Sequence, residues 1–256
     1  SWLYYTQVAE KAEILPLYKN LGETPLECLL RYKALHEEYK DTKMTYLGRL
    51  DPMAEGLLPV LAGDTRSKAQ YLEMDKTYEF EVLWGLSSDS HDILGKVTEG
   101  RFPHRLENKM ESLLKKIRSK TSQVYPLFSS KSFGGDFLKA RDAKIEEFDR
   151  PERGIKIFSL EHIHTRAITG REILNDVTKR IALVRGDFRQ KEILSAWNNL
   201  LMPLANETYL ISKFTIDVSS GTYVRGLAND MGEILNSGAL AWSIKRTRVG
   251  EYKISL

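Results

Sequence analysis

The chain has 256 residues, of which 42% are apolar and 10% aromatic, which excludes an intrinsically disordered chain and fits one large domain or two small ones. The net charge of +3 permits a nucleic-acid partner without requiring one. The single cysteine, Cys28, excludes an internal disulfide and a cysteine-based zinc site. No apolar stretch approaches the ~18 residues of a membrane span, and residues 1–5 lack a signal-peptide layout. We therefore expect a cytoplasmic protein without a membrane partner.

The first elements are predicted by capping and periodicity. Thr24, Pro25 and Glu27 give the capping-box signature of a helix start. Residues 65–72 can form a short helix, and residues 78–84 alternate apolar and polar, which is typical of a strand. Residues 87–95 read as a polar loop, and apolar positions in 110–117 predict an amphipathic helix.

Regular periodicity disappears over residues 123–150. A long loop within a compact domain is usually functional or disordered. Aromatic side chains interleaved with bases suit single-stranded RNA, because rings stack on bases and cations follow phosphates. A solvated mobile loop explains the same composition equally well. The bases of this segment are Lys131, Lys139, Arg141, Lys144 and Arg150.

The second half resumes regular patterns. Residues 155–163 predict a strand, 170–186 and 190–202 two helices, and 210–218 another strand. A helix follows from Val224, which Gly238 is placed to end. Strands and helices mix without strict alternation, so we expect an α+β fold with a mostly antiparallel sheet.

Residues 48–56, with the sequence Gly-Arg-Leu-Asp-Pro-Met-Ala-Glu-Gly, contain the most informative motif. Pro52 pushes Asp51 toward extended dihedral angles and so presents its carboxylate on a bent loop. Taken alone, Asp-Pro between two glycines is usually only a turn. The rest of the chain changes this interpretation.

Five ordered motifs resemble the TruB family of bacterial tRNA pseudouridine synthases. Residues 48–56 resemble its catalytic Gly-x-Leu-Asp-Pro-x-Ala-x-Gly motif. The other four are Lys19 to Pro25, Asp75 to Tyr78, Gly221 to Arg225, and Lys245 to Gly250. The resemblance covers most of the chain outside residues 164–206 and implies the pseudouridine synthase fold as one catalytic domain over residues 1–256.

The resemblance implies isomerisation of a uridine in RNA. Asp51 takes the central role, because a carboxylate can attack the ribose carbon, or abstract its protons, as the base departs. Arg225 is the motif-matched partner that keeps Asp51 ionised. Tyr78 is expected to stack on the flipped base and to take part in proton transfer, although an ordinary core tyrosine remains an alternative. Ile244 is expected to form the apolar floor under the base.

The expected partner is RNA, most specifically the T-arm of tRNA with its uridine at position 55. A base cannot rotate while stacked, so the nucleotide must be extruded at a cost of a few kcal/mol. Backbone contacts would offset this cost. Isomerisation demands no metal, and the sequence has no glycine-rich loop of the P-loop or dinucleotide-binding type, so we expect no cofactor. We also expect a monomer. The residues expected to contact RNA are Lys19, Tyr46, Lys131, Arg141, Lys245, Arg246 and Arg248, beside Ile244.

Three features depart from the family pattern. Tyr46 stands where the family has a histidine, and we hypothesise that it stacks in place of that residue. The sequence ends at Leu256, so we expect the protein to lack the family's RNA-binding PUA module. Residues 164–206 form a helical insertion, for which an RNA contact and a solvated flap are both open interpretations. Its bases are Arg166, Arg171, Lys179, Arg180, Arg185, Arg189 and Lys191.

Other functions were weighed against this one. The chain could modify another RNA, or it could be an RNA-binding or RNA-folding protein that has dispensed with catalysis. The joint presence of Asp51, Tyr78 and Arg225 disfavours a pure binder. A metal enzyme built on His162 and His164 is the weakest alternative, because alternate strand residues can chelate but one such pair is more often solvated.

Overall fold

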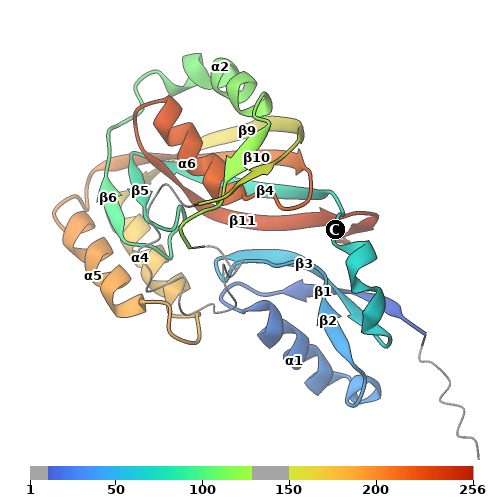
Figure 1. Cartoon of the computed structure of the whole chain (residues 1–256). Coiled ribbons are helices and arrows are strands. Elements are labelled where there is room, and N and C mark those ends of the chain that lie inside the picture. The colour runs from blue at the N-terminus through green and yellow to red at the C-terminus, as the bar shows by residue number, and fades with distance from the viewer. Residues whose placement is uncertain (1–10, 129–149, 256) are drawn as a thin grey trace, which may run out of the picture.

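The computed structural model describes residues 11–128 and 150–255, and it is built around an eight-stranded sheet (Figure 1). The main strand order is β1-β3-β11-β4-β10-β9, with β2 paired to β3 and β12 paired to β11. All neighbours are antiparallel except β3 and β11, which are parallel. The strands are β1 (Glu13–Lys19), β2 (Met44–Tyr46), β3 (Ala54–Ala62), β4 (Lys76–Trp84), β9 (Ile157–Thr169), β10 (Thr208–Val218), β11 (Ala239–Val249) and β12 (Tyr252–Lys253).

Helices cover both faces of this sheet (Figure 1). The helix α2 (Leu106–Arg118) packs with α6 (Val224–Ile234) over one face, in a cluster that includes Phe80 and Val82 of β4. The helices α4 (Gly170–Ile181) and α5 (Gln190–Leu201) share a second cluster with Leu83, whose side chain points the other way. This alternation follows from the two-residue period of a strand. The helix α1 (Pro25–Leu35) covers β1 and β3, and the short 3₁₀ helices are η1 (Glu37–Tyr39) and η2 (Thr65–Tyr71).

Two small strand pairs lie outside the main sheet. β5 (Leu86–Ser88) pairs with β6 (Val97–Glu99), and β7 (Ser122–Val124) pairs with β8 (Glu152–Gly154). The buried amide of Gln123 in β7 accepts a hydrogen bond from Tyr223 N at 2.9 Å and donates one to Tyr223 O at 2.8 Å. β7 thereby fixes the residue at which α6 begins.

The contact between β3 and β11 is unusually close. Gly56 has φ +117°, and a Cβ added there would lie 2.2 Å from the carbonyl oxygen of Arg246. Only glycine tolerates both the dihedral angle and the approach. This parallel pairing places Ile244 opposite Ala54, three residues beyond Asp51.

The α+β class with a mostly antiparallel sheet is confirmed, as is the capping box of Thr24 and Glu27. Several element boundaries were wrong. The strand predicted to end at residue 163 continues to Thr169 because it pairs with β10 over its full length. The helix predicted over 170–186 begins at Gly170 as expected but ends at Ile181. The loop predicted at 87–95 begins within β5, and α6 ends before Asn236, which takes the left-handed conformation ahead of Gly238.

No helix in residues 11–128 or 150–255 combines the length and apolar character needed to cross a membrane.

Candidate active site

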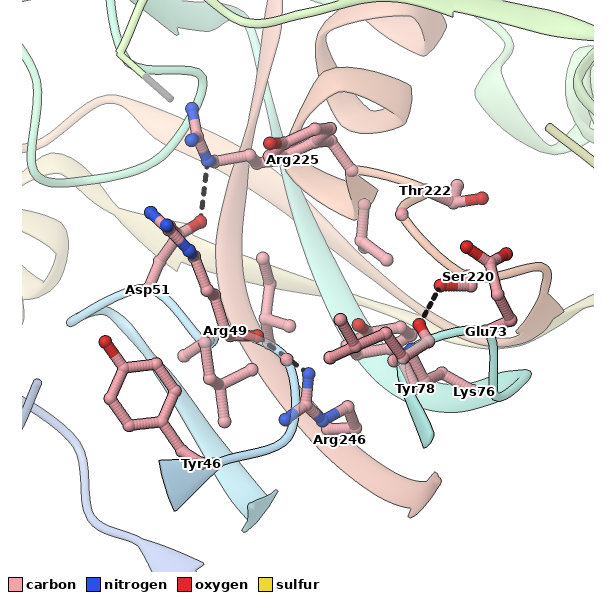
Figure 2. Close-up of a pocket in the computed structure, with 18 of the residues that line it drawn as sticks. Tyr46, Arg49, Asp51, Glu73, Lys76, Tyr78, Ser220, Thr222, Arg225 and Arg246 are labelled. Atoms are coloured by element: carbon pink, nitrogen blue, oxygen red, sulfur yellow. Dashed lines mark hydrogen bonds and ion pairs between the residues drawn. The ribbon is translucent and has the colours of Figure 1, made fainter. Parts of the chain in front are cut away.

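A cavity of about 430 Å³ opens between the 48–54 loop, the start of β4, the start of α6 and the strand β11 (Figure 2). Asp51, Tyr78, Arg225, Ile244 and Tyr46 all line it. These residues come from five separate parts of the chain. The structure therefore brings together the three residues predicted to be catalytic and three of those predicted to contact the substrate, the third being Arg246.

The loop that carries Asp51 is fixed by main-chain hydrogen bonds. Ala54 N donates to Asp51 O at 2.9 Å, and Gly22 N donates to Pro52 O at 2.7 Å. Gly48 enters the loop with φ +87°, a conformation that favours glycine. The Asp51 side chain retains 27% of its exposure. The carboxylate is thus held at the cavity wall and remains accessible to a substrate.

Arg225 is the ionic partner of Asp51, although 174 positions separate the two in the sequence. Arg225 Nε donates to Asp51 Oδ2 at 2.7 Å (Figure 2). The other guanidinium nitrogens donate to Ser90 O at 3.0 Å and Phe128 O at 2.5 Å. Burial opposes the charge of Arg225, but the carboxylates of Asp51 and Asp92 raise its pKa above the usual value. Because all three nitrogens are engaged, the arginine orients Asp51 rigidly.

A buried acidic loop lies behind this pair. Asp92 accepts hydrogen bonds from Ser90 Oγ at 2.6 Å and Leu94 N at 3.0 Å. Burial raises the pKa of Asp92 to about 6, against the opposing charge of Arg225. Burial and the charges of Arg225 and Arg150 lower the pKa of His91 to about 4, so this imidazole is neutral at pH 7. Sequence reasoning treated this loop only as a polar connection.

Tyr78 and Ile244 form an apolar wall of the cavity. Both are buried, at 7% exposure each, and both belong to the core cluster beneath α2 and α6. Tyr78 is therefore a core tyrosine that also lines the cavity, so the two interpretations of it are compatible. Tyr46, at the end of β2, is half-buried at the rim, with Lys68 Nζ 5.4 Å from its ring centroid.

Two residues predicted to contact RNA are buried instead. Lys19 is fully buried, and its Nζ donates to Asn20 O at 2.9 Å and Glu23 O at 2.7 Å. Burial lowers its pKa to about 8, against the opposing charge of Asp51. Arg246 is 1% exposed and donates to Leu57 O at 2.9 Å and Arg49 O at 2.8 Å. Both cations hold main chain on or near the Asp51 loop, and Arg246 also lines the cavity. Their contact with RNA stays a prediction.

The remaining predicted RNA contacts fall elsewhere. Arg248 donates to Thr77 Oγ1 and Gly250 O, at 2.8 Å each, which holds it against its own sheet. Lys245 lies between Ile244 and Arg246 on β11, so alternation turns it away from the cavity that both neighbours line. Lys131 and Arg141, with most of the predicted 123–150 loop, lie outside the described residues.

Sequence reasoning missed several cavity-lining side chains, notably Lys76, Arg153, Lys68 and Thr222. Lys76 could have been found, because it precedes Tyr78 by two residues on one strand and must share its face. Arg153 could not, because only the pairing of β8 with β7 carries it to the cavity.

The bases of the 164–206 segment divide into two groups. Arg166 pairs with Glu81 at 3.4 Å, Arg189 pairs with Asp89 at 2.9 Å, and the guanidinium of Arg180 lies 4.2 Å from the ring centroid of Trp242. These three contact other parts of the fold, although Arg166 is also exposed. The exposed members that form no ion pair with a described residue are Arg171, Lys179, Arg185 and Lys191.

The residues considered for a metal site do not form one. His162 Nε2 shares a hydrogen bond with Thr165 Oγ1 at 2.8 Å. Within the described ranges, no group of three His, Cys, Asp or Glu side chains is arranged to hold a metal ion.

Comparison of the sequence with known proteins identifies the family of this chain. The profile described as "TruB family pseudouridylate synthase (N terminal domain)" matches residues 36–181. The tRNA pseudouridine synthase B of Clostridium kluyveri is 25% identical over 243 residues, which cover 94% of this chain and 68% of that protein. The enzyme of the same name from Bacillus licheniformis is 29% identical over 244 residues, covering 94% of this chain and 66% of that protein.

Solved structures agree on the fold. One chain of a Cbf5-Nop10-Gar1 complex superposes with a TM-score of 0.56 at 20% identity, covering 94% of this chain and 50% of that one. A chain from an H/ACA RNP bound to a substrate RNA containing 2′-deoxyuridine gives a TM-score of 0.53 at 19% identity. This chain spans about half the length of those solved chains.

The fold and the profile match together define a pseudouridine synthase, and the chain belongs to the TruB family.

Proposed function

We propose that this chain isomerises a uridine of tRNA to pseudouridine, at position 55 in the T-arm, with Asp51 as the group that acts on the ribose. The observation that carries the proposal is the Asp51–Arg225 pair at 2.7 Å on the wall of a cavity with an apolar side. The names of the sequence relatives support tRNA as the substrate.

The chemistry fits the groups on this wall. The bond between uracil N1 and ribose C1′ breaks, the base turns, and a bond from uracil C5 to C1′ forms. C5 loses its proton and N1 gains one, so the reaction is redox neutral. Asp51 as a carboxylate can attack C1′, or remove a ribose proton, while the base is detached. Arg225 holds the carboxylate oxygen in one direction throughout.

The apolar wall fits a detached uracil. Tyr78 and Ile244 offer flat and aliphatic surfaces, on which an unstacked base can rest without losing hydrogen bonds to water. In this proposal Tyr46, which lines the cavity, stacks where the extruded base leaves a gap. A cavity of about 430 Å³ admits one nucleotide with a margin for rotation.

Tritium release from C5-labelled uridine in a T-arm stem-loop transcript tests the proposal, with the Asp51→Asn variant run beside the native chain. Release by the native chain alone supports both the reaction and the role of Asp51. Release by both proteins would refute the role of Asp51. Binding without release by either would favour another substrate RNA, or an RNA-binding protein of the same fold.

A further inference from the structure

The cavity wall carries more positive charge than the chemistry of Asp51 requires. Its lining includes six cationic residues and two acidic ones, whereas the whole chain carries a net charge of only +3. Arg225 forms an ion pair with Asp51 at 2.7 Å, which leaves five cationic residues and one acidic residue, Glu73, on the wall. Such a concentration of one sign indicates an anionic ligand. The cations are Arg49, Lys68, Lys76, Arg153, Arg225 and Arg246.

Lys76 is the most unusual member of this group. It is 8% exposed, lines the cavity, and donates from Nζ to Met74 O at 2.7 Å, which uses one of the three protons of an ammonium group. Burial, and then the charges of Arg246 and Arg153, lower its pKa to about 8, and the acidic neighbours Asp75 and Glu73 offset this only in part. A buried ammonium group beside two guanidinium groups is electrostatically unfavourable until an anion joins them.

Arg153 completes this end of the cavity. Its Nη2 donates to Ser220 O at 3.0 Å, which anchors the guanidinium against the 219–222 turn. Gly221 makes room for it, because a Cβ at that position would lie 2.1 Å from Arg153 Cζ, and Gly221 itself has φ +79°. Figure 2 shows Lys76 and Ser220 on the opposite side of the cavity from Asp51.

Arg246 adds a buried nitrogen that lacks a hydrogen-bond acceptor among the described residues. This nitrogen, Nη2, belongs to a side chain that lines the cavity. Because its other nitrogens hold main-chain carbonyls, the Arg246 guanidinium is fixed in place and adds positive charge to the cavity wall near Lys76.

We propose that Lys76 and Arg153 form a phosphate-binding subsite, which receives an RNA backbone phosphate next to the target uridine while the base rests on Tyr78 and Ile244. This inference rests on the proposed function and specifies how the same cavity holds its substrate. The ammonium group supplies a point charge, and the guanidinium supplies a planar fork that matches phosphate oxygens. A phosphate held there fixes the ribose relative to Asp51 across the cavity.

The test combines protein variants with RNAs in which one phosphate is made neutral. T-arm stem-loops carry a single methylphosphonate at each linkage flanking the target uridine, one at a time. Dissociation constants and tritium-release rates are measured for the native chain, Lys76→Met, Arg153→Met and Lys213→Met. Lys213→Met is the matched control, because this half-buried lysine of β10 lies on the opposite face of the sheet and pairs with Glu79 at 3.5 Å.

We expect Lys76→Met and Arg153→Met to bind the unmodified RNA roughly 10- to 100-fold more weakly, the range of a lost charge-assisted hydrogen bond. At one linkage, the methylphosphonate should weaken native binding by a similar factor and leave the two variants nearly unaffected. Lys213→Met should lose affinity on methylphosphonate substitution as the native chain does. The salt dependence of binding should fall by about one unit of slope in Lys76→Met.

If Lys76→Met and Arg153→Met lose the same factor of affinity for every RNA, modified or not, the inference is overturned, since Lys76 would then act on the base or on the fold. If Lys76→Met fails to fold, Arg153→Met carries the test alone, because Arg153 is only half-buried. If the native chain turns over, but at no linkage does the effect of the methylphosphonate depend on Lys76 or Arg153, the subsite is refuted and the proposed function stays intact. If the effect of one methylphosphonate on binding does depend on Lys76 and Arg153, but the native chain shows no turnover, the subsite is supported and the proposed function is refuted.

Discussion

Replacing Arg246 with methionine should lower both stability and turnover, because this buried guanidinium brackets the Asp51 loop. Arg246 donates to Arg49 O before Asp51 and to Leu57 O after it, at 2.8 and 2.9 Å. Hydrogen bonds from a charged donor contribute about 1.5–3 kcal/mol each. Methionine removes both bonds but also removes the penalty of a buried charge, so the net loss is about 2–4 kcal/mol.

That loss translates into measurable changes. For a chain of this size, about 2–4 °C of Tm per kcal/mol gives a fall of roughly 5–15 °C. A displacement of Asp51 by about 1 Å can reduce the rate by about 100-fold, so kcat should fall by roughly 10- to 100-fold while KM changes less. Thermal unfolding followed by circular dichroism and single-turnover tritium release measure the two effects.

Arg248→Met is the matched control for Arg246→Met. Arg248 lies two residues further along the same strand and bonds to Thr77 and Gly250, not to the Asp51 loop. Its loss should lower Tm with kcat close to that of the native chain. An Arg246→Met protein with native kcat, or an Arg248→Met protein with equally reduced kcat, would refute the bracketing role.

Four further results are expected. Arg225→Lys should lower kcat by roughly 100-fold with little change in RNA affinity, because lysine cannot reproduce three directed bonds; unchanged kcat would contradict the orienting role. RNA affinity should fall as pH rises through about 8, where Lys76 loses its proton, and this step should be missing in titrations of Lys76→Met. Gly56→Ala should lower the free energy of unfolding by at least about 2 kcal/mol in urea titrations, through the clash with Arg246 O, and a milder loss would mean that β3 and β11 can separate. Changing to glutamine the four exposed bases of the 164–206 segment that form no ion pair with a described residue should weaken RNA binding without lowering Tm if that segment contacts RNA; full affinity would identify it as structural. Those bases are Arg171, Lys179, Arg185 and Lys191.

Local patterns in the sequence predicted many of the helices and strands, and the resemblance of five ordered motifs predicted the candidate reacting groups. The capping box at Thr24, the alternation through Tyr78 and the apolar stripe after Val224 each depend on neighbours within a few residues, so they can be read from the chain directly. The motif around Asp51 and the motif ending at Arg225 both pointed to the pair that the structure joins at 2.7 Å.

Tertiary structure alone decided what each cation does. The sequence predicted Lys19 and Arg246 as RNA contacts and gave no role to Lys76, because it shows the charge of a side chain but not its burial. Its burial and its acceptors are set by strands distant in sequence: Arg246 bonds to carbonyls 189 and 197 positions away. The sequence by itself therefore predicted Asp51 and Arg225 as the candidate reacting pair, while the packing of β3, β4 and β11 determined which cations hold the Asp51 loop and which line the cavity.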